Sequence, residues 1–133
     1  MQAIFQHSIT IQASDIDSLG HVNNVVYLRY VQEVAEAHWE TCASDELKKA
    51  HLWVVLRHEI DYKAPAFLGQ SLLGRTWVEK ADGAKVWRYV HLLEVDSGKL
   101  VAQAKTLWCL LDAVTKRPKR ITEEIDTVFD QSR

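Results

Sequence analysis

Ten residues near the start of the chain, 15–24, read DIDSLGHVNN and bring together side chains that take part in acid–base chemistry. A carboxylate such as that of Asp17 can remove a proton from water or attack a carbonyl carbon, and an imidazole such as that of His21 can transfer protons near neutral pH. The side-chain amides of Asn23 and Asn24 can orient a carboxylate or hold a substrate. These four residues form the candidate catalytic site.

The segment leads into an amphipathic helix that we predict over residues 25–43. Its apolar stripe consists of Tyr27, Val31, Val34, His38 and Cys42. The first turn of a helix has N–H groups without intrahelical partners and carries partial positive charge, so it favours an oxyanion. Asp17 and the backbone amides around Asn24 and Val25 could therefore supply a base or nucleophile together with donors for developing negative charge, as a hydrolase requires.

Turn and capping chemistry offers another explanation of the same composition. Asp, Ser, Gly and Asn are common in turns and at helix N-caps. On this explanation Asp15 and Asp17 form the turn, and Asn23 or Asn24 caps the helix. The sequence alone leaves both explanations open.

Metal binding fits the segment poorly. DIDSLG resembles the first half of a calcium-binding loop, but Leu19 stands at the third ligand position and Val26 stands where the closing glutamate belongs. His21 with the two aspartates would need a further histidine or cysteine at ligand spacing, which the sequence does not provide. Glycine-rich nucleotide loops and the G-x-S-x-G nucleophile elbow are also missing from the sequence. We therefore expect no metal and no cofactor.

Composition indicates an ordinary soluble domain. The 133 residues are enough for one domain over 1–133, with 47% hydrophobic residues, a net charge of -2 and a pI of about 6.3. A nucleic-acid-binding domain would need a far more basic pI, and no apolar run is long enough to span a membrane. The N-terminus has no basic segment followed by an apolar run, so we expect no secretion signal. Cys42 and Cys109 read as free thiols, which suits the cytoplasm.

The remaining periodicity predicts the elements that must position the segment. Alternating apolar and polar residues predict strands over 5–13, 52–63, 71–80, 86–95 and 100–112. Thr122 is placed to cap a short final helix. In the second strand, the residues expected on one face are Val54, Leu56, His58, Ile60 and Tyr62.

Short turns between the last strands, including Asp82–Gly83, favour an antiparallel sheet, and the long helix is the element that can cover it. The predicted class is therefore α+β. The last strands are apolar on both faces, more than one helix can bury, so we expect a homodimer or homotetramer.

The string D-x-D-x-x-G-H-V-N-N-x-x-Y, over residues 15–27, resembles the signature of hotdog-fold acyl thioesterases. This group includes 4-hydroxybenzoyl-CoA thioesterase-like enzymes and the plant acyl-carrier-protein thioesterases. The order of the predicted elements extends the resemblance loosely across most of the chain. The resemblance implies an antiparallel sheet of five or six strands wrapped around one long central helix, and dimers with active sites at the subunit interface.

The resemblance also implies roles for particular residues. In the 4-hydroxybenzoyl-CoA branch the second aspartate of the pair is catalytic, and it corresponds to Asp17; the thioester carbonyl is bound by a backbone amide that would fall near Asn24. The plant enzymes have an asparagine where this chain has Leu19, so a mechanism that uses that asparagine does not carry over. The 4-hydroxybenzoyl-CoA branch lacks a histidine at the position of His21. The roles of His21, Asn23 and Asn24 therefore stay open.

The expected function is hydrolysis of an acyl thioester, either acyl-CoA or an acyl-carrier protein, with Asp17 as general base or nucleophile. Val25 and Tyr27 are the expected contacts to the substrate. The basic stretch KRPKR, residues 116–120, is either a solvated turn or a contact to CoA phosphates through Lys119 and Arg120. We expect no nucleic-acid or membrane partner. The alternatives are a non-hydrolytic hydroxyacyl dehydratase of the same fold and a catalytically silent acyl-binding module.

Overall fold

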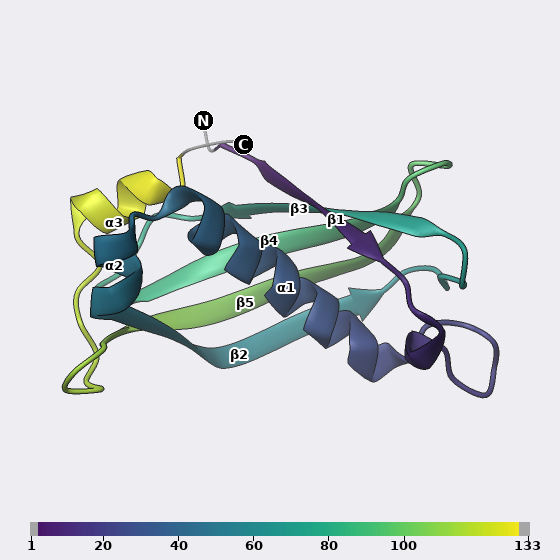
Figure 1. Cartoon of the computed structure of the whole chain (residues 1–133), viewed down its shortest axis with the longest axis horizontal. Helices are drawn as coiled ribbons and strands as arrows, with labels where there is room; N and C mark the ends of the chain where they lie inside the picture. The colour runs from purple at the N-terminus through teal and green to yellow at the C-terminus, as the bar shows by residue number, and fades with distance from the viewer. Residues whose placement is uncertain (1–2, 131–133) are drawn as a thin grey trace.

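A five-stranded antiparallel sheet with one long helix across its face dominates the computed structural model, which describes residues 3–130 (Figure 1). The strands are β1 Phe5–Thr10, β2 His51–Tyr62, β3 Ser71–Val78, β4 Lys85–Glu94 and β5 Leu100–Asp112. Their order in the sheet is β1-β3-β4-β5-β2, and every neighbouring pair is antiparallel. The expected α+β hotdog architecture is confirmed, with five strands.

The order of the strands places β2 at an edge. It precedes β3 in the chain, yet it pairs with β5 along almost its whole length. The other edge strand, β1, has only 6 residues against the 12 of β2. The long open edge of the sheet is therefore that of β2.

The described part of the chain also contains four helical segments: η1 Ala13–Asp15, α1 Asn24–Cys42, α2 Asp45–Ala50 and α3 Glu123–Val128. The predicted long helix is confirmed, and Thr122 caps α3 through a bond from the amide of Ile125. The sequence analysis did not predict α2, because six residues are too few to show a helical period. No helix within residues 3–130 is long and apolar enough to cross a membrane.

The core lies between α1 and the inward face of the sheet. The predicted stripe is confirmed, since Tyr27, Val31, Val34 and His38 are all buried. The contact is closest at Gly74 of β3, where an added Cβ atom would lie 2.3 Å from a methyl carbon of Val34. Glycine therefore lets the helix lie directly on the middle of the sheet.

The expected faces of β2 are partly wrong. The pairing with β5 shifts register between Val55 and Arg57, which marks a β-bulge. Val55 is paired with Trp108 and His58 with Thr106, so two residues three apart share the inward face. Ile60 packs against the core as expected, whereas Val54 and Leu56 are exposed and Trp53 and Val55 pack inward. Because of the extra residue in the bulge, the residues before Leu56 lie on the face opposite to the one expected.

Candidate active site

The loop between η1 and α1 is closed by its own backbone. Ile16 and Val22 form an isolated bridge, and the Asp17 amide donates to the carbonyl of His21 at 2.9 Å. Gly20, with a φ of 86°, makes the reversal and donates its amide to the Asp17 carbonyl at 3.0 Å. The loop lies at one end of the long axis of the molecule, beside the N-terminus of α1 (Figure 1).

Asp15 anchors this loop. Its carboxylate is buried and accepts hydrogen bonds from the Tyr30 hydroxyl at 2.6 Å, from the Arg29 guanidinium at 2.5 Å and from the Gln12 amide at 3.1 Å. Burial alone would raise the pKa of Asp15, but the bonds from Tyr30, Arg29 and Gln12 outweigh it and lower that pKa. Its carbonyl also accepts the Asn23 amide. The side chain and the backbone carbonyl of Asp15 thus both hold the loop against the helix.

Asp17 is placed differently from Asp15. Its side chain keeps 22% of its surface exposed. One carboxylate oxygen, Oδ1, accepts the Leu19 amide at 2.9 Å, and the other, Oδ2, lies 3.8 Å from Nδ1 of His21. The same imidazole nitrogen lies 3.3 Å from the Val22 carbonyl. Within residues 3–130, Oδ2 accepts no hydrogen bond, so it is available to a water molecule or a substrate.

The first turn of α1 begins beside this loop. Asn23 is the N-cap, and its side-chain oxygen accepts the Val25 amide at 3.0 Å while its carbonyl accepts the Val26 amide at 2.9 Å. The Asn24 amide has no hydrogen-bond partner in the described part of the chain. Asn24 and Val25 are both exposed. The capping explanation therefore holds for Asn23, and the Asn24 amide is the donor that remains for a ligand oxygen.

Aromatic and apolar side chains surround this end of the helix. Tyr27 is buried next to Tyr62, with ring centroids 5.5 Å apart, and the Tyr62 hydroxyl donates to the Asn24 carbonyl at 3.2 Å. Burial, followed by the charges of Tyr62 and Asp17, raises the pKa of Tyr27. Further apolar side chains exposed on the two loops at this end are Leu19, Phe67 and Leu68. An apolar acyl group would find complementary surface here.

The predicted phosphate contacts lie elsewhere in the chain. Lys119 and Arg120 follow β5 in the connection to α3, which lies at the opposite end of the long axis from η1 (Figure 1). The Lys119 amide is held by the Leu110 carbonyl, and Arg120 is exposed. Asp17, His21, Asn23, Asn24, Val25 and Tyr27 are thus brought together within one chain, whereas Lys119 and Arg120 are separated from them.

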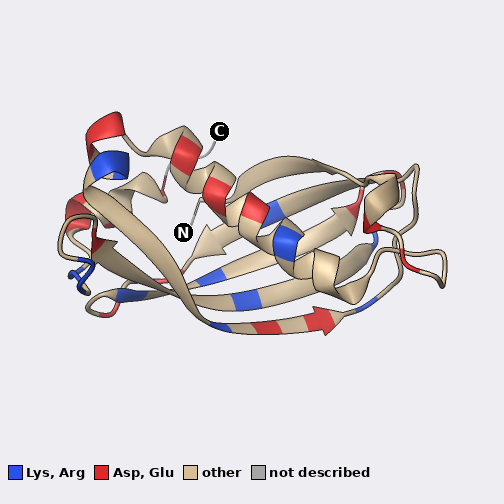
Figure 2. Ribbon diagram, turned by 60° about the horizontal axis from the view of Figure 1, so that its bottom comes forward, with Lys and Arg blue, Asp and Glu red and all other residues tan. Residues whose placement is uncertain are grey.

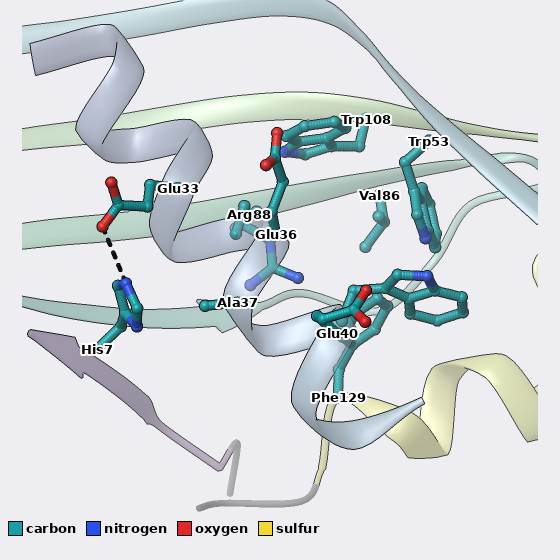
Figure 3. A pocket seen from close by; sticks show the side chains of 12 residues that line it. His7, Glu33, Glu36, Ala37, Glu40, Trp53, Val86, Arg88, Trp108 and Phe129 are labelled. Atoms are coloured by element: carbon teal, nitrogen blue, oxygen red, sulfur yellow. Dashed lines mark hydrogen bonds and ion pairs between the residues drawn. The ribbon is translucent and has the colours of Figure 1, made fainter. Parts of the chain in front are cut away.

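Sequence reasoning missed a cavity of about 430 Å³ beside the C-terminal half of α1 (Figure 3). Its lining includes Trp53, Val86, Arg88, Trp108 and Phe129. Arg88 lies on the same face of β4 as Val86 and Val90, which are buried, so its burial could have been predicted from the alternation along the strand. A charged residue at an inward position of a strand was the available signal.

Comparison with known proteins agrees with these features. The family model described as the thioesterase-like superfamily matches residues 11–129. The chain is 26% identical over 129 residues to the long-chain acyl-CoA thioesterase FadM of Escherichia coli (strain K12), covering 95% of this chain and 97% of FadM.

Two solved structures illustrate the likeness of fold. Slr0204, a 1,4-dihydroxy-2-naphthoyl-CoA thioesterase from Synechocystis, superposes with a TM-score of 0.81 at 18% identity over 96% of both chains. A thioesterase from Thermus thermophilus complexed with coenzyme A and Zn gives a TM-score of 0.81 at 24% identity, over 93% of this chain and 90% of that one. The family match covers most of the chain, including the loop that carries Asp17 and the whole of α1, and the chain therefore belongs to the thioesterase-like superfamily.

Proposed function

We propose that this single-domain protein hydrolyses acyl-CoA thioesters to a carboxylic acid and CoA. The observation that supports the proposal most directly is the position of Asp17 in the loop that leads into α1, in a member of the thioesterase-like superfamily. Within residues 3–130, one carboxylate oxygen of Asp17 and the Asn24 amide, the first of α1, form no hydrogen bond. FadM, which acts on long-chain acyl-CoA, covers nearly the same length.

In the proposed mechanism the thioester carbonyl oxygen accepts the Asn24 amide. Negative charge develops on that oxygen as the carbonyl carbon becomes tetrahedral, and the N-terminus of α1 stabilises it. Asn23 occupies the Val25 amide and so fixes the direction of the first turn. One well-placed donor of this kind contributes roughly 10²–10³ in rate.

Asp17 acts on the same carbon by one of two routes. As a general base it takes a proton from a water molecule, whose oxygen attacks the carbonyl, and the thiolate of CoA leaves and is protonated. As a nucleophile it forms a mixed anhydride with loss of the thiolate, and water then hydrolyses the anhydride. His21 lies beside Asp17 in either route and orients its carboxylate.

The CoA moiety is placed by a second subunit in this proposal. A homodimer formed along the open edge of β2 would cover its exposed Leu52, Val54 and Leu56. The basic turn of one subunit could then supply Lys119 and Arg120 to the active-site end of the other. A tetramer built from two such dimers would keep this arrangement.

A thiol-release assay over a panel of acyl thioesters tests the function. We expect turnover of acyl-CoAs, with aliphatic and aromatic acyl groups of different lengths and a matching acyl-carrier protein as separate arms. Addition of water to an enoyl-CoA without release of thiol would indicate a dehydratase. Binding of every acyl-CoA without turnover would indicate a silent module, and either result would overturn the proposal.

We also propose the cytoplasm as the compartment. Cys109 is a buried free cysteine, and free thiols persist in reducing compartments.

A further inference from the structure

The cavity beside the C-terminal half of α1 is separate from the Asp17 end of the helix. From Asn24 to Glu36, at the mouth of the cavity, the helix rises about 18 Å at about 1.5 Å per residue. The cavity opens between α1, the inward face of β2, β4 and β5, and the ring of Phe129 (Figure 3). A ligand in this cavity would thus contact side chains other than those of the proposed active site.

Two tryptophans of the cavity lining, Trp53 and Trp108, have buried indole N–H groups without hydrogen-bond partners in the described residues. The Nε1 atoms of Trp53 and Trp108 are buried, and neither has a partner within residues 3–130. Trp108 as a whole is 9% exposed. An indole N–H can only donate, and leaving it unpaired in an apolar site is unfavourable. Both groups therefore call for an acceptor inside the cavity.

Arg88 adds a positive charge to the same wall. It is 4% exposed, and its Nη1 donates to Thr76 Oγ1 at 2.9 Å and to His38 Nδ1 at 3.0 Å. Neither partner is a carboxylate, and Arg88 forms no ion pair with a carboxylate within the described residues. Burial lowers the pKa of Arg88 to about 9, so it stays protonated at pH 7. A buried cation without a counterion favours binding of an anion.

The remaining walls are apolar. Val86 and Ala35 are buried, and Trp39 and Phe129 contribute aromatic surface with ring centroids 5.8 Å apart. The ligand must therefore carry an apolar body as well as an acceptor.

Exposed glutamates of α1 stand at the mouth of the cavity. Figure 2 shows acidic residues at intervals along this helix. Glu33 pairs with His7 at 2.9 Å, and Glu40 pairs with Lys48 at 3.1 Å. Glu36 is exposed, so its charge is screened by solvent. The rim therefore carries a net negative charge that is exposed to solvent, whereas the interior carries the buried positive charge of Arg88.

From these groups we infer that the cavity binds an apolar monocarboxylate, with the carboxylate on Arg88 and the indole N–H groups of Trp53 and Trp108, and the hydrocarbon body against Val86, Trp39 and Phe129. If the proposed hydrolysis is correct, the ligand has the chemistry of the acid that the reaction releases. The site itself does not depend on that hydrolysis.

Three ten-carbon probes test the head-group chemistry by isothermal titration calorimetry. Decanoate is expected to bind at least about tenfold more tightly than decanol, because a hydrogen bond to a charged group is worth about 1.5–3 kcal/mol and 1.4 kcal/mol is tenfold. Decylamine is expected to bind more weakly than either. Equal binding of decanoate and decanol, or tightest binding of decylamine, would overturn the inference.

Indole N–H resonances locate the probe. In a ¹⁵N-labelled sample, the signals of Trp53 and Trp108, assigned from Trp53→Phe and Trp108→Phe variants, should shift downfield on addition of decanoate. The signal of Trp77, which stacks on Tyr89 on the outer face of the sheet, should stay in place. If neither signal shifts, the two indole N–H groups do not bind the carboxylate of decanoate, and the inference is wrong.

Substitutions separate charge from shape. Arg88→Met should weaken decanoate binding about tenfold to a hundredfold and leave decanol binding unchanged, while Arg88→Lys should retain part of the preference. Trp108→Phe, which removes one donor and keeps an aromatic ring, should weaken binding by about two- to tenfold, and it tests the site if the Arg88 variants do not fold. Trp77→Phe is the matched control. Unchanged decanoate affinity in folded Trp53→Phe and Trp108→Phe variants would contradict the inference.

An Asp17→Asn variant separates this site from the active site. It should bind decanoate with unchanged affinity and show the same indole shifts, whether or not the protein is a hydrolase. Loss of decanoate binding in Asp17→Asn, with binding retained in Arg88→Met, would place the acid at the catalytic end of α1 instead.

Discussion

Two aspartates separated by one residue have opposite environments in this loop. Asp15 is enclosed by three donors, whereas Asp17 retains exposure and an oxygen with no bond in the described chain. Substitution of the two residues should therefore affect different measurements.

Asp17→Asn should lower kcat by about 10²–10⁴ without loss of folding, because the amide cannot serve as base or nucleophile. The asparagine oxygen can still accept the Leu19 amide, so the loop should keep its shape. Thiol release and circular dichroism measure the two effects. Ser18→Ala, an exposed neighbour, is the control. Unchanged turnover in Asp17→Asn would remove Asp17 from the mechanism, and a larger loss in His21→Ala would reverse the roles of the two residues.

Asp15→Asn should instead destabilise the fold, by about 1–3 kcal/mol, because the new amide group places a donor against Arg29 or Tyr30. Urea unfolding followed by fluorescence measures the change. Asp61→Asn is the matched control, because Asp61 is exposed and, among residues 3–130, its side chain accepts only from Gln103. Equal stability of the Asp15 and Asp61 variants would contradict the anchoring role.

The pH dependence of stability follows from the lowered pKa of Asp15. Its pKa in the folded chain lies below the ordinary value of 3.8, so the stabilisation is present above pH 3.8 and is lost as the pH falls through the folded pKa. Wild-type protein should lose stability on acidification below about pH 4, and Asp15→Asn should lose less over the same interval. Urea midpoints at pH 6, 4 and 3 make the comparison. Parallel pH profiles would show that other carboxyl groups account for the loss.

At the scale of elements, the contact of α1 with the sheet is narrowest at Gly74. Gly74→Ala should destabilise the protein by about 1–3 kcal/mol, because the new methyl overlaps Val34. In the double variant with Val34→Ala the overlap is largely relieved, because the nearest remaining atom is the Cβ of residue 34 at 3.3 Å, so the two losses should be less than additive. Chemical unfolding of the four proteins measures the coupling. Strict additivity would mean that the helix shifts freely to make room.

Many of the helices and strands were predictable from local sequence patterns. The span of α1 and its buried stripe follow from a helical period, and β3, β4 and β5 follow from alternation and short turns. The position of β2 beside β5 depends on pairing between distant segments, which a local pattern does not contain. The bulge near Leu56 has no turn residue to mark it.

The candidate site was predictable in part for the same reason. Asp17 and the start of α1 are near in sequence, so their proximity follows from one loop and one cap. The cavity collects Trp53, Arg88 and Trp108 from three strands, and only the sheet order brings them together. Contacts between residues that are near in sequence can thus be predicted from the pattern, whereas contacts between distant strands require the structure.

At the scale of the whole molecule, the separation of Asp17 from Lys119 and Arg120 predicts shared active sites. Lys119→Ala with Arg120→Ala should raise KM for acyl-CoA at low salt, with little change in kcat, because phosphate contacts favour substrate and transition state alike. An unchanged KM at low salt would remove the basic turn from the proposed site.

Mixing this double variant with Asp17→Asn should then recover activity. A heterodimer of the two chains has one site with an intact Asp17 and an intact basic turn, because each site draws on both chains. After unfolding and refolding together, kcat/KM at low salt should exceed the mean of the two parents. A mixture that shows only the mean would place both groups in one subunit or exclude the basic turn.

The bulge in β2 keeps both halves of the strand in phase with the cavity. Leu56 is the extra residue, so Val55 and His58 both face inward although they are three residues apart. Deleting Leu56 would restore a regular ladder with β5 and leave Trp53 and Val55 on the inward face, because Val55 would keep Trp108 as its partner. The gene could therefore lose the codon of Leu56 without turning the indole of Trp53 out to solvent.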